Sequence, residues 1–234
     1  MKKLMAFAAV ACVAASAFVS CGGSASLKTD EDSVSYAIGM DIGMQFKDHP
    51  AINLDPLLAG IKDAFAGNEQ FESSEIGRIV NEYLTVKLPA KNLEASNKFL
   101  EEVQKNNPNI QKTESGLLYE ILVAGDQNVK ASSDEDVVKV VYHGELKDGK
   151  VFDSSKERGD TVELALNRVI AGWQEGMKLV GKGGKIKLWI PADLAYGVQG
   201  AGQIQPNEAI TFEVDLVDVI PAATDDAANE EAAK

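Results

Sequence analysis

The sequence predicts an α+β protein, in which an all-α N-terminal part and a long connecting helix precede an antiparallel sheet domain. Two observations support this prediction. Apolar residues recur at helical spacing through the first half of the chain, and after Asn109 they alternate with polar residues at strand spacing. Several alternating segments and a single helical one follow, which is typical of an antiparallel α+β domain.

The composition excludes several classes of protein. Of the 234 residues, 45% are apolar and 25% are charged, as in ordinary globular proteins. The formal net charge of -13 repels phosphate backbones, so we expect no nucleic-acid partner. The only histidines and cysteines are His49, His143, Cys12 and Cys21. A site built from a His/Cys cluster is therefore nearly excluded, and a zinc site or a hydrolytic triad would have to use one of the two histidines. We expect no metal and no cofactor.

The first 20 residues are predicted to be a secretory signal peptide. Lys2 and Lys3 give a positive start, and an apolar stretch too short to span a membrane comfortably follows. Cys21 then stands where a bacterial lipobox places its diacylated cysteine, and residues 21–29 form a lipidated tether. The alternative is ordinary cleavage beside a free Cys21, which is less favourable because an unpaired exposed thiol is a liability in an oxidising compartment.

The first predicted helix runs from Asp30 to Phe46. We expect Asp32 or Ser33 to be its N-cap. Gly39 and Gly43 lie four residues apart on one face, which permits the close approach of another helix. The alternative is that these glycines only relieve packing within the chain.

Two further helices complete the N-terminal half. One has Pro56 in its first turn and ends at Gly67, so that residues 30–72 form a helical domain. Residues 73–110 form a polar connecting helix that Pro89 should kink or divide. A helix this polar bridges two domains or pairs with a partner.

The second half of the chain is predicted to be mostly strands. Alternation places Tyr142 and Phe212 on the inner faces of their strands, and Val169 to Val180 forms a short helix. Residues 222–234 are small and acidic and are predicted to be a disordered tail. The predicted strands lie near residues 117–123, 138–142, 162–166, 186–190 and 210–216.

Three features suggest chemistry that the spacing does not support. Gly181 to Lys185 resembles a phosphate-binding loop, but no Ser or Thr follows the lysine and a strand follows where a helix is needed, so we interpret it as a turn. Asp215 and Asp218 suggest a carboxylate pair, yet alternation puts Asp215 on the solvent face. His143 points away from the inner face for the same reason.

Five aromatic residues in five different segments remain as candidates for a site. They either pack only as core, which composition alone favours, or line an apolar pocket. These residues are Tyr142, Phe152, Trp173, Tyr196 and Phe212.

Four separated motifs strongly resemble the FKBP-type peptidyl-prolyl cis-trans isomerases. They cover about residues 115 to 220 in family order, and residues 33–39 and 54–67 are similar to the N-terminal helical domain of macrophage-infectivity-potentiator-like bacterial lipoproteins. The resemblance implies that residues 111–221 form a half-barrel of bent antiparallel sheet around one short helix. The motifs are Val140 to Leu146 with Asp148 to Ser155, Val169 to Gly176, Ile190 to Gly197, and Ile204 to Asn207 leading into Phe212.

The resemblance also implies a pocket between the sheet and the short helix. Trp173 forms its floor, the backbone N–H of Ile170 binds a substrate carbonyl, and Asp153 lies beside the twisting amide, held by Tyr142 and Arg158. The implied catalytic residues are Tyr142, Phe152, Asp153, Ile170, Trp173, Tyr196 and Phe212. The implied substrate-binding residues are Val169, Ile204, Arg158 and Val162.

The sequence departs from the family pattern at the rim of this pocket. Ala171 replaces a proline or arginine, Gln205 replaces the first proline of Ile-Pro-Pro, and Val162 and Leu164 stand where members often have an aromatic residue. These departures put substrate preference in doubt, whereas the residues of the floor are intact.

The implied activity is isomerisation of X-Pro bonds in extracytoplasmic proteins, which assists their folding. Rotating an amide costs about 18 to 20 kcal/mol of mostly resonance energy. A dry aromatic site disfavours the charge-separated planar form, so it favours the twisted state without a cofactor. The alternative is a dimeric chaperone or a proline-peptide binding module with weak or no catalysis.

The resemblance and the N-terminal residues together predict partners and location. We expect unfolded or proline-containing polypeptides as substrates, macrolide inhibitors of the family as ligands, and a homodimer formed through the N-terminal helices. The lipid on Cys21 would attach the protein to a membrane of the bacterial cell envelope. The outer membrane is favoured because no aspartate follows Cys21, and the protein would face the periplasm or the exterior.

Overall fold

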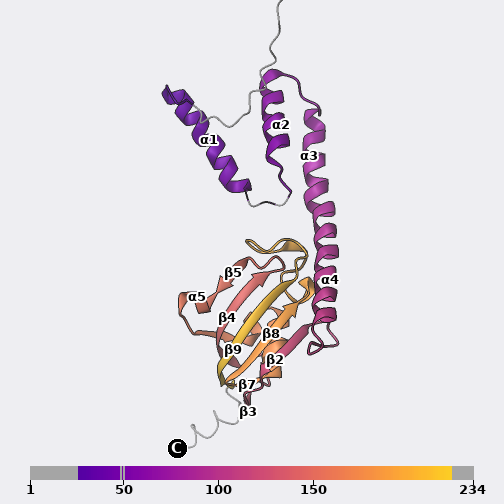
Figure 1. Ribbon diagram of the computed structural model, residues 1–234, viewed down its shortest axis with the longest axis vertical. Helices are drawn as coiled ribbons and strands as arrows, with labels where there is room; N and C mark the ends of the chain where they lie inside the picture. Colours follow the sequence, from indigo (N-terminus) through magenta and orange to yellow (C-terminus); the bar gives the residue numbers. More distant parts are fainter. Residues whose placement is uncertain (1–25, 48, 50, 223–234) are drawn as a thin grey trace, which may run out of the picture. The chain divides into compact units, whose positions relative to one another are not determined.

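The computed structural model describes residues 26–47, 49 and 51–222, which form two compact units dividing between Glu69 and Gln70 (Figure 1). The expected boundary of the helical domain, at residue 72, lies close to this division. The predicted signal peptide, the predicted lipidation at Cys21 and residues 223–234 of the predicted tail lie outside the described residues.

The first unit contains helices α1 (Asp30–Phe46) and α2 (Leu54–Ala66). Thr29 is the N-cap of α1: its hydroxyl accepts from the Asp32 N–H at 3.1 Å, and the Asp32 carboxylate accepts from the Thr29 N–H at 3.1 Å. The predicted cap at Asp32 or Ser33 was therefore wrong, because Asp32 is the third helical residue of a capping box. Helix α2 ends as predicted at Gly67, whose φ of 70° is left-handed.

The second unit begins with a long helix. Helix α3 (Ser73–Glu82) continues through a π-helical turn (Tyr83–Lys87) into α4 (Leu88–Asn106). The Leu88 N–H donates to the Tyr83 carbonyl within this wider turn. The turn ends two residues before Pro89, and a proline has no N–H and a ring that crowds the preceding helical turn. The expected disturbance at Pro89 thus takes the form of a widened turn, and the helix is not divided.

None of the described helices is both long enough and apolar enough to cross a membrane.

The centre of the second unit is an antiparallel sheet of seven strands, which confirms the predicted α+β fold (Figure 1). Along the sheet the order is β1 (Gln111–Lys112), β2 (Leu118–Val123), β8 (Gly184–Ile190), β9 (Ile210–Ile220), β4 (Val137–Leu146) and β5 (Val151–Ser154), and β6 (Val162–Ala165) also pairs with β4. A separate ribbon pairs β3 (Asp126–Lys130) with β7 (Gly181–Lys182).

One edge of β4 is shared by two strands. β5 pairs with β4 at His143 to Glu145, and β6 pairs with it at Val137 to Val140. Between them the chain leaves the sheet and makes the single-turn helix α5 (Ser155–Arg158). Because the chain leaves the sheet here, β4 has no paired strand on this side beside Tyr142 in the described part of the chain.

A short helix covers the inner face of the sheet. Helix α6 (Ala171–Gly176) lies so close to β8 that a Cβ atom at Gly172 would lie 2.5 Å from Ile190, and one at Gly176 would lie 2.7 Å from Leu188. Glycine at both positions permits this approach. The predicted helix at 169–180 is accordingly shorter and continues as a 3-10 turn. The described 3-10 turns are Leu166–Arg168, Met177–Leu179, Ala192–Leu194 and Gly197–Gln199.

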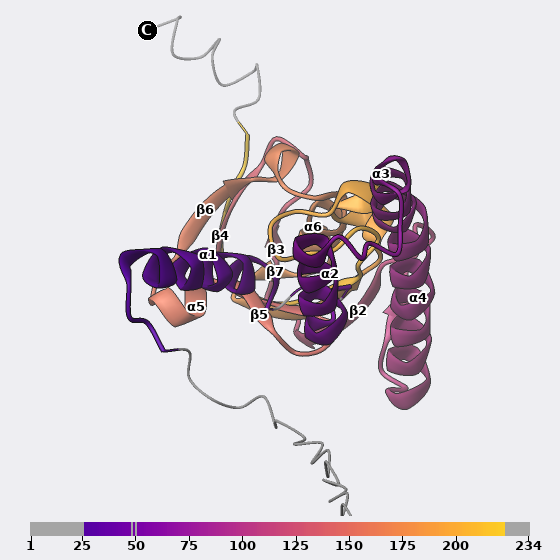
Figure 2. The same ribbon diagram turned by 90° about the horizontal axis from the view of Figure 1, so that it is seen from above.

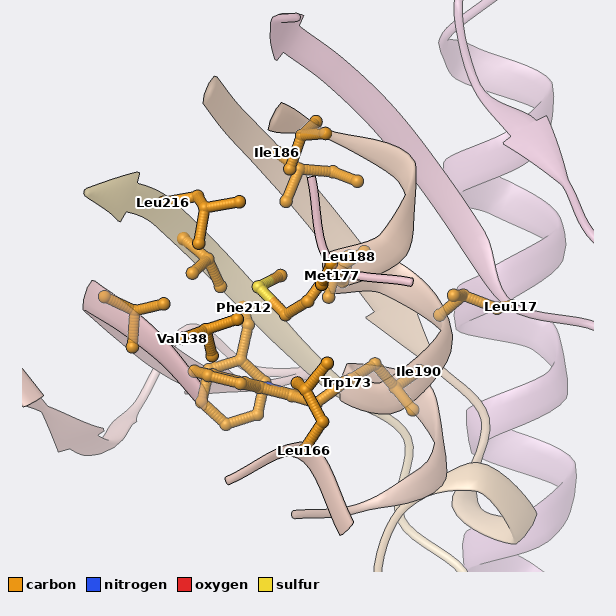
Figure 3. Close-up of a cluster of buried hydrophobic side chains, with 14 of the residues drawn as sticks. Leu117, Val138, Leu166, Trp173, Met177, Ile186, Leu188, Ile190, Phe212 and Leu216 are labelled. Atoms are coloured by element: carbon orange, nitrogen blue, oxygen red, sulfur yellow. The ribbon is translucent and has the colours of Figure 1, made fainter. Parts of the chain in front are cut away.

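The hydrophobic core lies between α6 and the sheet. Trp173 and Met177 reach from the helix segment toward inward-facing residues of β8 and β9 (Figure 3). Completely or almost completely buried side chains include Leu117, Val138, Leu166, Met177, Ile186, Leu188, Ile190 and Leu216. The open end of this core forms the candidate site.

Candidate active site

A cavity of about 240 Å³ opens between α6 and the strands β4, β5 and β9. It contains all seven residues that the family resemblance implies to be catalytic, together with the implied substrate contact Val169. The lining residues are Tyr142, Phe152, Asp153, Leu164, Arg168, Val169, Ile170, Trp173, Tyr196 and Phe212.

Aromatic rings build the floor and walls of the cavity. Trp173 is only 3% exposed, and its ring meets Tyr142 and Phe212 edge to face, with centroids 5.4 Å and 5.1 Å apart. Phe152 meets Phe212 in the same way at 5.4 Å. The buried indole N–H of Trp173 has no hydrogen-bond acceptor among the described residues. The floor is therefore built from aromatic rings that hold one another in fixed orientations.

Asp153 is the acidic group of the cavity, which Arg168 also lines, and two partners fix its carboxylate. The Tyr142 hydroxyl donates to Oδ2 at 2.6 Å, and the Arg158 guanidinium donates to Oδ1 at 2.6 Å. Arg158 also donates to the Tyr142 hydroxyl oxygen at 3.3 Å. Because Arg158 follows on α5, the excursion between β5 and β6 is what brings it to Asp153.

These contacts keep Asp153 ionised. Burial acts to raise the pKa of Asp153, but the hydrogen bonds from Tyr142 and Arg158 and the positive charge of Arg158 outweigh it and lower the pKa below its usual value. Burial, followed by the hydrogen bond to Asp153, raises the pKa of Tyr142. The hydrogen bond to Asp153 raises the pKa of Arg158. The site thus presents a carboxylate, a neutral phenol and a guanidinium.

The rim joins this cavity to a second hollow of about 370 Å³. Phe152, Asp153 and Tyr196 line both hollows, and Ile204 lines the second. Burial raises the pKa of Tyr196, with a smaller effect from the charge of Asp153, so its hydroxyl remains a neutral donor. The predicted contact Ile204 is therefore brought to the same rim as Tyr196.

Ile170 offers a backbone donor at the cavity wall. It is the N-cap residue of α6, and its carbonyl accepts from the N–H groups of Trp173 and Gln174. Among the described residues, its own N–H has no acceptor. Gln174 fixes the neighbouring segment, because its side-chain amide donates to the Val169 carbonyl at 2.9 Å. A substrate carbonyl that enters the cavity can accept from this free N–H.

Some expectations and the geometry differ. Val162 pairs with Val140 in the sheet and lines neither hollow. Arg158 touches Asp153 without lining the cavity. Leu164 and Arg168 do line it and were absent from the candidate set. The signal for Leu164 was its place two residues after Val162, on the same face of the strand.

His143 lies outside the cavity, as alternation predicts. Its ring lies 2.9 Å from the Ser154 hydroxyl and 3.3 Å from the Glu145 carboxylate. The predicted turn in the segment Gly181–Lys185 lies at Gly183, whose φ is 76°, because Gly181–Lys182 forms β7 and Gly184–Lys185 begins β8.

Taken together, the bent antiparallel sheet, the single helix across its inner face and the aromatic cavity between them define a half-barrel binding domain. Such a cavity can enclose a small apolar ring and present one N–H donor and one carboxylate to its polar neighbours.

Comparisons with known proteins identify this domain. Residues 128–217 match the family model described as FKBP-type peptidyl-prolyl cis-trans isomerase. Residues 31–121 match the model of the domain amino terminal to FKBP-type peptidyl-prolyl isomerase.

Similar proteins extend over most of the chain. FkpA of Escherichia coli, an FKBP-type peptidyl-prolyl cis-trans isomerase, is 36% identical over 90% of this chain and 83% of the relative. A probable FKBP-type isomerase of Haemophilus influenzae is 41% identical over 82% of this chain and 86% of the relative. Outer membrane protein MIP of Legionella longbeachae is 35% identical over 95% of this chain and all of the relative.

A solved structure agrees with these relatives. The crystal structure of FkpA from Escherichia coli has a TM-score of 0.57 and 34% identity, covering 85% of this chain and all of that chain. The chain belongs to the FKBP-type peptidyl-prolyl cis-trans isomerase family, and it is a peptidyl-prolyl cis-trans isomerase that acts on proline-containing polypeptides.

Proposed function

We propose that the aromatic cavity between α6 and the sheet is the site where the X-Pro bond turns. The observation that carries this proposal is the combination of a floor of four aromatic rings with a carboxylate that two partners hold ionised at the mouth. The proline ring fills the apolar floor. The amide to be rotated then lies beside Asp153 and within reach of the Ile170 N–H.

The physical basis of catalysis is the difference in polarity between two states of the amide. Resonance makes the planar amide charge-separated, and rotation about the C–N bond costs about 18 to 20 kcal/mol because that resonance is lost. An apolar cavity solvates the planar form poorly, and the fixed donor and carboxylate favour the twisted form. Lowering the barrier by about 4 kcal/mol would accelerate the reaction roughly a thousandfold.

A protease-coupled isomerisation assay on the full chain tests this site. We expect Phe152→Ala and Asp153→Ala to lower kcat/KM at least tenfold. Phe71→Ala and Asp134→Ala are matched controls, because both side chains are exposed and lie outside the cavity. Retention of wild-type kcat/KM in both cavity variants would place the reaction elsewhere.

We further propose that the protein is a homodimer joined through α1 and α2. In the described part of these helices no side chain is buried, and Val34, Ile38 and Phe65 are 60%, 58% and 91% exposed. Gly39 and Gly43 have nothing within 4 Å of where a side chain would begin. Helices without a core of their own gain stability by burying such residues against a second copy.

The same exposed helices support a second function, the holding of unfolded chains. A dimer that presents two cavities gains effective concentration on one client chain. Suppression of aggregation of an unfolded test protein measures this activity independently of isomerisation. An inactive wild type that still suppresses aggregation would favour the chaperone and contradict catalysis.

We propose that the mature protein is lipid-anchored in the bacterial cell envelope, at the outer membrane. The signal-like residues 1–20 and the lipobox-like position of Cys21 support this, as does the name outer membrane protein given to a relative of similar length. Cys21→Ser should release the protein from membranes. Mass spectrometry of the mature N-terminus should find an acylated cysteine, and an unmodified one would contradict the proposal.

We also propose that macrolide inhibitors of the family bind in this cavity, because its apolar walls and single backbone donor suit a ring with adjacent carbonyls. Calorimetric titration of the wild type and Phe152→Ala tests this, and equal affinity for both would contradict it.

A further inference from the structure

The segment that carries Ile204 to the rim is attached to the connecting helix α4. This segment, residues 197–209, leads from Tyr196 to the start of β9. Figure 1 and Figure 2 show α4 running beside the domain that contains the sheet. Both elements belong to the second unit of the chain.

Two side-chain amides join the helix and the segment in opposite directions. The Asn92 amide donates to the Pro206 carbonyl at 2.9 Å. The Asn207 amide donates to the Pro89 carbonyl at 3.1 Å. Both asparagines are buried, at 9% and 8% exposure. A buried amide that loses its partner costs free energy, so this pair fixes the register between helix and segment.

A serine completes the attachment one helical turn further on. The Ser96 hydroxyl donates to the Asn207 carbonyl at 2.8 Å and accepts from the Ala209 N–H at 2.9 Å. Ser96 is 2% exposed. A serine inside a helix often bonds back to its own helix, whereas this hydroxyl uses both its donor and its acceptor on the segment. Asn92 and Ser96 are four residues apart, so they lie on one face of α4.

The attached segment is closed on itself and reaches the cavity. Ile204 and Ala201 exchange backbone hydrogen bonds of 2.8 and 2.9 Å, and the Asn207 N–H donates to the Gly197 carbonyl at 2.8 Å. Asn207 has a φ of 57°, in the left-handed region that L residues rarely adopt, and it is held there by these contacts. A displacement at Asn207 would therefore reach both Ile204 and Tyr196.

We propose that Asn92 and Ser96 are positioning residues for the isomerase. They hold segment 197–209 so that Ile204 and Tyr196 face the substrate. The connecting helix α4 therefore also supports the rim of the cavity. The inference rests on the proposed location of the active site. Loss of the attachment weakens substrate binding at the rim and leaves the floor and Asp153 in place, so KM changes more than kcat.

The test compares two isosteric variants of one helix. Asn92→Asp replaces the donor by an acceptor that faces the Pro206 carbonyl, and Asn97→Asp adds the same charge at an exposed position of the same helix. We expect Asn92→Asp to raise KM for an X-Pro peptide at least fivefold with kcat within twofold of wild type. Asn97→Asp should leave both unchanged.

Hydrogen exchange of the full chain gives a readout independent of activity. In Asn92→Asp, amides of residues 200–207 should exchange at least tenfold faster, while those of β4 keep wild-type rates. Ser96→Ala should act in the same direction without adding charge. Equal KM and equal exchange in Asn92→Asp and Asn97→Asp would overturn the proposal. Wild-type activity in Phe152→Ala would instead overturn the site, with the exchange result unaffected.

Discussion

Asp153 is held for its orientation more than for stability. Its side chain is 44% exposed and that of Arg158 is 48% exposed, so solvent screens the pair. Exposed ion pairs typically contribute about 0 to 1 kcal/mol to folding. The short contacts from Tyr142 and Arg158 therefore matter chiefly because they fix where the negative charge stands relative to the amide.

Asp153→Asn separates orientation from charge. The variant keeps the shape of the side chain, so the free energy of unfolding should change by less than about 1 kcal/mol. Removal of the charge beside the amide should lower kcat/KM by roughly tenfold or more, equivalent to about 1.4 kcal/mol. Thermal unfolding and the coupled assay measure the two effects, and unchanged kcat/KM would show that the charge has no part in the reaction.

The pH dependence follows from the same groups. The pKa of Asp153 is lowered and those of Tyr142 and Tyr196 are raised, so these groups keep their charge state across neutral pH. We expect kcat/KM to be flat between about pH 5 and 8 and to fall only below about pH 4, as the carboxylate is protonated. The small stability that Asp153 adds is likewise lost as pH falls through its lowered pKa. Exchange NMR of a proline peptide measures this profile, and a midpoint near pH 6.5 would contradict it.

Within strand β4, Gly144 leaves room for the aromatic rings of the cavity. A side chain at this position would begin 2.7 Å from Cε1 of Phe212 and 2.9 Å from Cζ of Phe152. Both rings form the cavity wall. The two rings thus occupy the space that a side chain at position 144 would take.

Gly144→Ala should move these rings and destabilise the domain by about 1 to 3 kcal/mol, with a rise in KM. Gly77→Ala on α3 is the matched control, because nothing lies within 4 Å of its side-chain position. That change should stabilise the helix by about 0.5 to 1 kcal/mol. Denaturant unfolding compares the two, and equal stability of both variants would contradict the packing described for Gly144.

The sequence predicts the elements whose side chains follow a clear period. Alternation places Tyr142 and Phe212 correctly on the inner face, whereas Ile121 and Val123 also alternate and are still 37% and 51% exposed. The short strands β3, β5 and β7 show no clear alternation of apolar and polar residues. The bond from Asn92 to Pro206 spans 114 positions, and no local pattern reveals it.

In the whole molecule, the second unit contains the proposed active site, and we propose that the first unit serves assembly. The second unit holds the cavity and its own buried core. The helices of the first unit bury no described side chain. The resemblance to known isomerases could predict both parts and their order, but the residues that attach α4 to the rim depend on contacts within this chain.

Ile38→Glu tests the assembly. A charge on this exposed apolar position of α1 should convert the dimer to a monomer, because burying an unpaired charge at an interface is costly. Ser33→Glu adds the same charge in the first turn of α1, where helices tolerate acidic residues, and should remain dimeric. Sedimentation measures both, and a monomeric wild type would contradict the dimer.

We propose above that this isomerase binds and turns X-Pro bonds in the aromatic cavity. The most direct measurement is NMR titration of the full chain with a short X-Pro peptide, which follows backbone amides and the cis-trans exchange of the peptide together. We predict the largest shifts at Val169, Ile170 and Tyr196, with accelerated exchange that Phe152→Ala abolishes. Shifts concentrated on α1 and α2, with exchange no faster than in free peptide, would contradict the claim.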